Sequence, residues 1–343
     1  MSTNAGPRMM MGEATFPSGI ALLIDFGTLH LWQHARPPVW PEAADDPAGD
    51  GLVDLQLHGP HAEHAGRELG RQWHPHFLYD VGTDDIGEIQ QAIGQLNARG
   101  MQAGIAPLPQ RVPHRTRVEY ALRHGRGAGE VPFFAMNAVA IAGVPPGGRF
   151  PVVGTRQAGN NEQWHEVTLE INPNVPAVRR EKIGTVMVDC ARLMFADVDA
   201  LGAMWSENNV PDGLADFAFW GLHAEGVARH FNAPPLGDDQ FGWKNLPIQE
   251  AAARGEAIEK VKENDPNVRF ATDFRPHTQS WQLLELIRAA PTESAVLDLG
   301  PARVTGFMTT WGDGEFTVYR DLDAQGGLVR VGVVFDDGEG ESN

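Results

Sequence analysis

The chain has 343 residues, of which 42% are hydrophobic, and its formal net charge at pH 7 is −18. This length and composition predict a soluble globular protein of about two domains rather than a disordered chain. No apolar run reaches the roughly 18 residues of a transmembrane helix, and the acidic balance argues against nucleic acid as a direct partner. The same charge would favour a basic protein partner.

The first half of the chain is expected to begin with a disordered tail at residues 1–15. A buried strand or hairpin follows within 19–32, and a loop rich in Pro, Asp and Gly occupies 37–51. The later elements are expected in this order: a strand at 53–57, a turn at 59–60, a helix to about 72, helices at 84–98 and 113–124, and strands at 132–143, 149–155 and 164–171.

The second half begins after a linker at 173–181, and an acidic tail at 336–343 is expected to be disordered. Its expected elements are a strand at 184–196, a helix at 197–207, a strand at 215–220, helices at 222–231, 247–263 and 278–289, and strands at 295–299, 302–310, 315–321 and 328–335. Helices grouped in the middle and strands grouped at the end favour an α+β fold with antiparallel sheets.

The chain nearly repeats itself once. Residues 51–69 and 213–231 are identical at 8 of 19 positions without a gap, which includes His61 opposite His223. Asp25 pairs with Asp189 in the same way. A period of about 160 residues is the size of a domain. We therefore predict two tandem homologous domains at 16–172 and 182–335, each with a largely antiparallel sheet and about three helices.

The repeat helps to interpret acidic residues near the end of the chain. Trp311-Gly-Asp313-Gly lies between two predicted strands, and the first copy keeps the glycines of this turn without the acid. Asp321 and Asp323 begin a segment that is similar to half of an EF-hand loop. Its last ligand position is Gly332, so a hairpin turn is the better interpretation. Trp311, Asp313, Asp321, Asp323 and Trp220 are the candidate binding residues.

Histidines form a second group, with five of them within 19 residues. A zinc site needs three or four converging ligands, and the second copy keeps only the partner of His61. The shared histidine is therefore expected to cap or pack, with a metal site as the alternative. The candidate metal ligands are His58, His61, His64, His74 and His76.

A second histidine recurs with a glutamate at the same spacing in both copies. The pairs are His114 with Glu130 and His277 with Glu293. Each pair could be a general acid–base couple or a structural hydrogen bond, and the structural interpretation is favoured because no nucleophile motif accompanies it. The single cysteine, Cys190, lies in an apolar run and is expected to be a buried thiol in a reducing compartment, the cytoplasm. The N-terminus does not have the pattern of a secretory signal.

Residues 182–335 resemble a bacterial family of unknown function. The motifs are Val188-Asp189-Cys190-Ala191-Arg-Leu-Met-Phe195-Ala196-Asp197 and the Trp311-Gly-Asp-Gly-Glu-Phe316 turn. The first copy is a degenerate relative. The resemblance implies a bacterial accessory or immunity-type protein, and it brings no catalytic residues.

The expected function is non-enzymatic binding of another protein, without a cofactor, as in an immunity or accessory protein that neutralises or escorts its partner. One alternative is a hydrolase or metal-dependent enzyme that uses the acidic turn residues or the histidines. Another is a structural subunit of a larger assembly.

Overall fold

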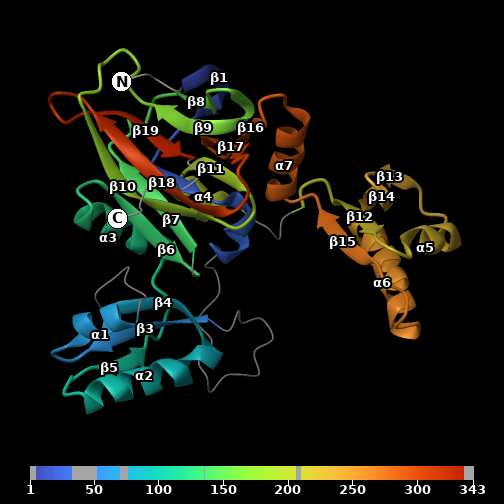
Figure 1. Cartoon of the computed structure of the whole chain (residues 1–343), viewed down its shortest axis with the longest axis horizontal. Helices are drawn as coiled ribbons and strands as arrows, with labels where there is room; N and C mark the ends of the chain where they lie inside the picture. The colour runs from blue at the N-terminus through green and yellow to red at the C-terminus, as the bar shows by residue number, and fades with distance from the viewer. Residues whose placement is uncertain (1–4, 33–51, 70–75, 135, 206–209, 336–343) are drawn as a thin grey trace. The chain divides into compact units, whose positions relative to one another are not determined.

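The computed structural model describes residues 5–32, 52–69, 76–134, 136–205 and 210–335 (Figure 1). In this part of the chain, seven α-helices accompany four sheets in which every pair of neighbouring strands is antiparallel. This arrangement confirms the predicted α+β class. The chain divides into two compact units, one formed by 1–205 with 287–343 and the other by 206–286.

The first unit contains two six-stranded sheets. Sheet A has the strand order β1 (Ala5–Ala14), β8 (Phe150–Gln157), β9 (Asn160–Glu170), β19 (Leu328–Val334), β18 (Gly314–Leu322), β10 (Arg179–Val188). Sheet B has the order β16 (Ser294–Leu299), β17 (Ala302–Met308), β11 (Arg192–Asp197), β2 (Ile20–Ile24), β7 (Met136–Ala142), β6 (Ala128–Phe133).

The core of this unit lies between sheets A and B. Strand β8 alternates buried and half-buried residues along its whole length, so that one of its faces is directed to the core. Strand β2 is buried at every position, as expected for a strand in the middle of sheet B. Trp164, Phe195 and Phe307 are among the fully buried side chains that fill the core.

A smaller sheet of the first unit, sheet C, has the order β4 (Phe77–Gly82), β3 (Leu52–His58), β5 (Gly104–Pro107). The helices α1 (Ala62–Glu68) and α2 (Ile86–Ala98) pack on one face of it, and a 3₁₀ turn, η3 (Thr83–Asp85), precedes α2. The remaining helices of this unit are η1 (Phe26–Leu31), α3 (His114–His124) and α4 (Val198–Met204).

The second unit contains sheet D, with the order β13 (Pro235–Gly237), β14 (Gln240–Pro247), β12 (Leu214–Trp220), β15 (Ala271–Pro276). Phe217 and Phe219 of β12 form a buried cluster with residues of α5 (Ala224–Phe231) and α6 (Ile248–Asn264). The boundary between the two units lies within α7 (Gln279–Ala289).

Both halves of the sequence contribute strands to the same sheets, in mirrored order. Each half supplies three neighbouring strands to sheet A and three to sheet B, and the halves meet at the β9–β19 and β2–β11 pairs. The compact units therefore do not follow the predicted boundary at 173–181, because pairing across the halves holds both large sheets together. Three residues of that expected linker, 179–181, belong to β10.

Several local predictions are corrected by the structure. The expected tail at 1–15 is wrong, because residues 5–14 form β1, which pairs with β8. The single strand predicted at 132–143 is the hairpin β6–β7. The short strands β4, β5, β13, β14 and β15 were not predicted. The loop predicted at 37–51 and the tail predicted at 336–343 lie outside the described residues.

The structural correspondence of the halves also shifts two of the sequence pairings. Both β1 and β10 have a bulge just before a glycine, Gly12 and Gly184, and counting from these glycines puts Asp25 level with Asp197 rather than with Asp189. Asp25 caps η1 and Asp197 caps α4, each through side-chain bonds to backbone N–H groups. The β6–β7 and β16–β17 registers likewise place Glu130 opposite Val296 instead of Glu293.

Candidate binding surface

The turn residues Trp311 and Asp313 brace the first unit. Trp311 packs against the main core, and its indole Nε1 donates a hydrogen bond of 2.7 Å to the carbonyl oxygen of Trp164. Asp313 accepts a hydrogen bond of 2.8 Å from the backbone N–H of Ala191, so the two motifs of the family resemblance lie against each other. These contacts give both side chains a structural role.

The three candidate aspartates Asp313, Asp321 and Asp323 do not converge on one site. Asp323 accepts hydrogen bonds from the backbone N–H groups of Gln325 (2.9 Å) and Gly327 (2.6 Å), which confirms the hairpin turn. Asp321 is buried and forms an ion pair with Arg330 at 2.5 Å. Asp313 precedes the nine-residue strand β18 and Asp323 follows it, so about 30 Å separate them along the strand.

The shared histidines hold the same backbone contact in both halves. The N–H of Gln102 donates to Nδ1 of His61 at 3.0 Å, and the N–H of His61 donates to the carbonyl of Gln102. His223 makes the same reciprocal pair with Arg269, with an N–H to Nδ1 distance of 2.8 Å. Both exposed rings therefore hold a neighbouring backbone segment, and neither makes a side-chain hydrogen bond that caps its helix.

The other candidate histidines take separate places. The ring of His58 lies over Gly104, and Nε2 of His64 is 3.7 Å from the Glu68 carboxylate. His76 is exposed, and His74 lies outside the described residues. Among the residues with described positions, no group of three or more His, Cys, Asp or Glu side chains could hold a metal ion.

The expected His–Glu pairs have other partners. His114 stacks on Trp32 with 4.0 Å between ring centroids, while Glu130 accepts a hydrogen bond from the N–H of Thr185 at 2.8 Å. Glu293 contacts Arg156 at 3.3 Å.

In the second unit, the ring of His277 lies between two carboxylates. Its Nδ1 is 2.9 Å from the Asp212 carboxylate, and its Nε2 is 3.1 Å from the Asp216 carboxylate. Its ring stacks on Trp281 at 3.6 Å. Trp220 also belongs to this unit, where it is half-buried and pairs with Gln240 and Ala271 at the end of β12.

Cys190 is half-buried at the turn between β10 and β11, so the expectation of a fully buried thiol is wrong. Its N–H donates to the Asp25 carboxylate at 3.0 Å. Burial, followed by the nearby carboxylates of Asp25, Asp189 and Asp313, raises the pKa of the thiol. A raised thiol pKa disfavours the nucleophilic thiolate.

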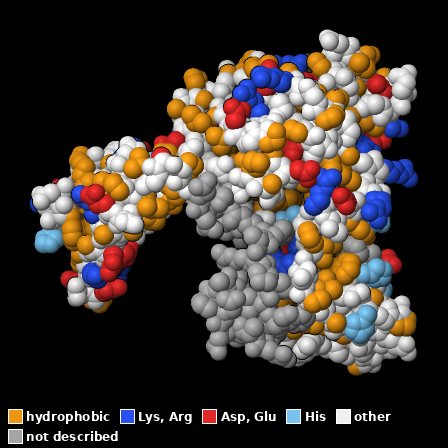
Figure 2. Space-filling view, turned by 180° about the vertical axis from the view of Figure 1, so that it is seen from behind, with side chains coloured by type: hydrophobic (Ala, Val, Ile, Leu, Met, Phe, Trp, Pro, Cys, Tyr) orange, Lys and Arg blue, Asp and Glu red, His pale blue; other side chains and the backbone are white. Residues whose placement is uncertain are grey.

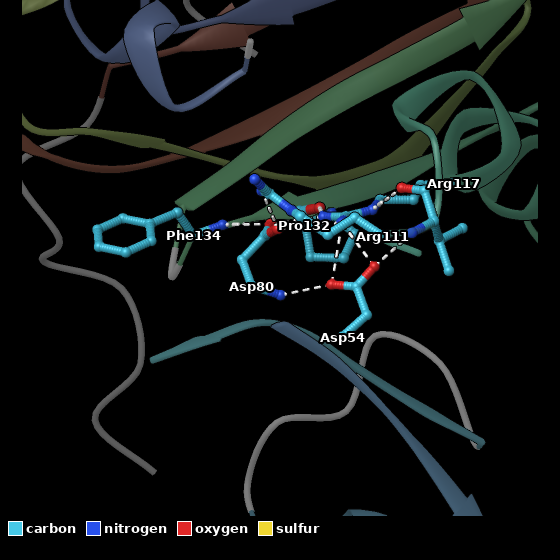
Figure 3. A network of polar contacts seen from close by, with 7 residues as sticks. Asp54, Asp80, Arg111, Arg117, Pro132 and Phe134 are labelled. Atoms are coloured by element: carbon cyan, nitrogen blue, oxygen red, sulfur yellow. Dashed lines mark hydrogen bonds and ion pairs between the residues drawn. The ribbon is translucent and has the colours of Figure 1, made fainter. Parts of the chain in front are cut away.

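A buried ion-pair network that was not predicted joins sheet C to α3 (Figure 3). Arg117 of α3 contacts the Asp80 carboxylate at 2.5 Å and the Asp54 carboxylate at 3.1 Å, and Arg111 forms a further ion pair with Asp80. The backbone N–H of Phe134 donates to Asp80 at 2.9 Å. All four charged side chains are shielded from solvent, so the network ties elements together and offers no ligand access.

The pKa values of the two carboxylates in the network shift in opposite directions. Burial, only partly offset by the charge of Arg117, raises the pKa of Asp54 above its ordinary value. Burial acts in the same direction on Asp80, but the charges and hydrogen bonds of Arg117 and Arg111 outweigh it and lower its pKa. Asp54 lies in the repeated block 51–69, where residue 216 of the second block is also Asp, whereas its partner Asp80 becomes apparent only through the fold.

The outer face of sheet A carries a pocket of about 490 Å³ under the segment that connects β9 to β10. Its lining residues come from β1, β8, β9, β19 and the connection, and they are Arg8, Met10, Pro151, Val153, Glu170, Pro173, Val175, Pro176, Ala177, Val329 and Arg330. Three hydrophobic side chains at or beside the pocket are exposed to solvent: Met10 by 58%, Val175 by 38% and Val178 by 62%.

The connecting segment forms a fixed wall of this pocket. The side-chain amide of Asn172 donates to the carbonyl of Leu328 at 2.8 Å, and its backbone N–H donates to Val329 at 2.9 Å. At the other end, the N–H of Val178 donates to the carbonyl of Leu322 at 2.9 Å. The wall is thus held at both ends before any ligand arrives, which lowers the entropy cost of binding.

A row of alternating charges crosses sheet A beside the pocket. Strand register places Glu170 opposite Arg330, Arg330 opposite Asp321, and Asp321 opposite Arg180. Arg8 of β1 extends the row through a contact of 2.7 Å with Glu170. Cross-strand pairs of opposite charge stabilise a sheet surface, and here they also place guanidinium groups at the pocket rim.

None of the described helices is long and apolar enough to cross a membrane. Comparisons with protein families, curated proteins and solved structures find no match to this chain.

Proposed function

We propose that this chain is a non-enzymatic protein that binds another protein through the pocket on the outer face of sheet A. The observation that carries the proposal is that exposed Met10 and Val175 both line a preformed pocket. Exposed apolar groups that form a contiguous patch mark interaction sites more often than scattered ones do. An immunity or accessory protein, which acts by binding, would use such a surface.

The placement of the acidic residues favours binding over the enzymatic alternative. Asp313 and Asp323 lie at opposite ends of β18, and Asp321 is held in an ion pair with Arg330. A hydrolase that used all three would need them around one substrate atom. A structural subunit of a larger assembly is the second candidate, because it too would cover this patch.

A protein rather than a nucleic acid is the proposed partner. On the face shown in Figure 2, described Lys and Arg side chains lie in small groups beside Asp and Glu, with hydrophobic side chains between them. Nucleic-acid binding needs a continuous basic surface. The cytoplasm is the proposed location, since a single cysteine suits a reducing compartment.

We further infer that the two halves arose by tandem duplication. The mirrored strand orders of sheets A and B and the shared roles of His61 and His223 support this inference. The pocket has no equivalent lining in the second half, where Lys182 and Tyr319 take the places of Met10 and Val153. Because Val329 and Arg330 of the second half also line the pocket, binding would be a property of the joined halves.

Co-purification with a matched pair of variants tests the proposed function. Tagged protein carrying Met10→Asp and Val175→Asp should lose a partner that the parent protein retains. Leu222→Asp, at an exposed site of the second unit, should keep it. If a toxin gene lies beside this gene, the same double variant should also lose protection against that toxin. A partner that remains bound to the double variant would refute the assignment of this surface.

A further inference from the structure

The charges that the pocket presents to solvent have the opposite sign to the protein as a whole. In the Arg8–Glu170 pair, the arginine side chain is 59% exposed and the glutamate 8%. In the Arg330–Asp321 pair, the corresponding values are 34% and 5%. The carboxylates therefore lie beneath the guanidinium groups, and a ligand would meet cationic groups on a chain of net charge −18.

Both arginines retain hydrogen-bonding capacity toward the pocket. Arg8 contacts Glu170 through one terminal nitrogen, and Arg330 contacts Asp321 through Nε. A guanidinium group has five N–H donors, so further donors of each can reach a ligand. Carboxylates are the groups that a guanidinium binds in the strongest geometry.

Spacing along β1 sets the pattern that a ligand must match. Arg8 and Met10 pair regularly with Thr155 and Val153, so both side chains point to the outer face about 7 Å apart. An extended segment places its own residues i and i+2 on one face at the same spacing. Apart from Arg330 and the Glu170 carboxylate, which is paired with Arg8, aliphatic and proline side chains line the rest of the pocket, and its described lining contains no aromatic ring.

We propose that the pocket binds an extended segment of a partner protein that presents a carboxylate at one position and an aliphatic side chain two residues away. The carboxylate lies against Arg8 and Arg330, and the aliphatic side chain lies between Met10, Val153 and Val175. This inference rests on the proposed function and adds the chemistry of the partner. It favours an acidic segment over the basic one that the net charge alone would suggest.

Titration of the full-length protein with blocked peptides tests the proposal. The probe is acetyl-Ser-Glu-Ser-Leu-Ser-amide, and the controls replace Glu by Lys or Leu by Ser. We expect the Glu–Leu peptide to bind with a dissociation constant of about 1 mM or below, and at least about tenfold more tightly than either control. Its affinity should fall as salt is raised.

Two variants locate the binding. Met10→Ser, at an exposed position, should lower the affinity for the Glu–Leu peptide about fivefold or more without a change in the circular dichroism spectrum. Arg8→Gln should remove the preference for Glu over Lys. Three results would overturn the inference: the Lys peptide binds as tightly as the Glu–Leu peptide or more tightly, neither variant changes the affinity, or no peptide binds at about 5 mM.

The outcomes separate this inference from the proposed function. If partner capture requires Met10 and Val175 but the Glu–Leu peptide shows no preference, the binding function stands and the partner chemistry is wrong. If the peptide binds as expected but the Met10 and Val175 variants still retain the partner, the pocket chemistry stands and the proposed function is wrong.

Discussion

Substitution of Asp80 by Asn tests how the first unit is held together. The change keeps the size of the side chain but removes the charge that faces Arg117 and Arg111, and it leaves Asp54 as the only carboxylate of the network. Removing one partner of a buried ion pair typically costs about 3–5 kcal/mol. We expect the free energy of unfolding to fall by about that amount.

Asp54→Asn is the matched control, because it removes the other carboxylate of the same network. Asp54 accepts backbone N–H groups from Asp80 (2.8 Å) and Val112 (2.5 Å). An amide oxygen can keep one of these bonds, while the amide NH₂ would face the other N–H. The charge is also disfavoured by burial, as its raised pKa indicates. A loss of about 1–3 kcal/mol is expected, smaller than for Asp80→Asn.

The two variants should respond to pH with opposite signs. The pKa of Asp80 is lowered from 3.8, so its stabilisation is present above 3.8 and is lost as the pH falls through the folded value. The pKa of Asp54 is raised from 3.8, so its contribution is present below 3.8 and is lost as the pH rises through the folded value. The deficit of Asp80→Asn relative to the parent should therefore grow with rising pH, and that of Asp54→Asn should shrink.

Urea unfolding between about pH 3 and pH 7, followed by circular dichroism and tryptophan fluorescence, measures both deficits. Hydrogen exchange at the amides of β3 and β4 shows whether the loss is located at the network. Equal losses for the two variants at neutral pH, or deficits that change with pH in the same direction, would refute this account of the network.

Three further predictions concern other parts of the molecule. His277→Ala removes a buried hydrogen bond to Asp216, so it should lower the free energy of unfolding of the second unit by about 1–3 kcal/mol and speed hydrogen exchange in β12 and β15. The control His230→Ala, at an exposed position, should have neither effect. Gly59→Ala should lower the stability of the fold, because the φ of Gly59 is +100° and a Cβ would lie 2.5 Å from the Gln102 carbonyl oxygen. Gly87→Ala, on α2 with open space around it, should instead raise the stability by up to about 1 kcal/mol, and thermal unfolding measures both changes. Residues 1–172 and 173–343 should co-purify when expressed together, since the β9–β19 and β2–β11 pairs join the halves; two fragments that each fold alone as monomers would contradict this.

Local chemistry in the sequence carried much of the secondary structure. The period of α2 and its preceding acidic turn, the proline before α3, and the Asp–Gly turn after Asp321 all match the structure. The repeated sequence pattern also indicated a structural role for His61, and His61 and His223 each accept a hydrogen bond from a backbone N–H. These signals depend only on near neighbours in the chain.

Strand β1 escaped prediction because its partner is distant in the sequence. The strand carries exposed Met10 and Arg8, and among the described strands it pairs with β8, which begins at Phe150. Its residues become a strand through that pairing and not through their own pattern. The bulges before Gly12 and Gly184, from which Asp25 and Asp197 lie at equal distances along the chain, likewise become visible only once the strands are paired.

The sequence by itself determined the α+β class, most helices and the repeated order of elements, because periodicity, caps and turns are local properties. Only the tertiary structure decided that both halves share two sheets, that Asp80 faces Arg117, and that Arg8, Met10 and Val175 meet around one pocket. The residues concerned lie up to more than 300 positions apart along the chain, as do Arg8 and Arg330 at the pocket, and no single stretch of the chain specifies which distant residues come together.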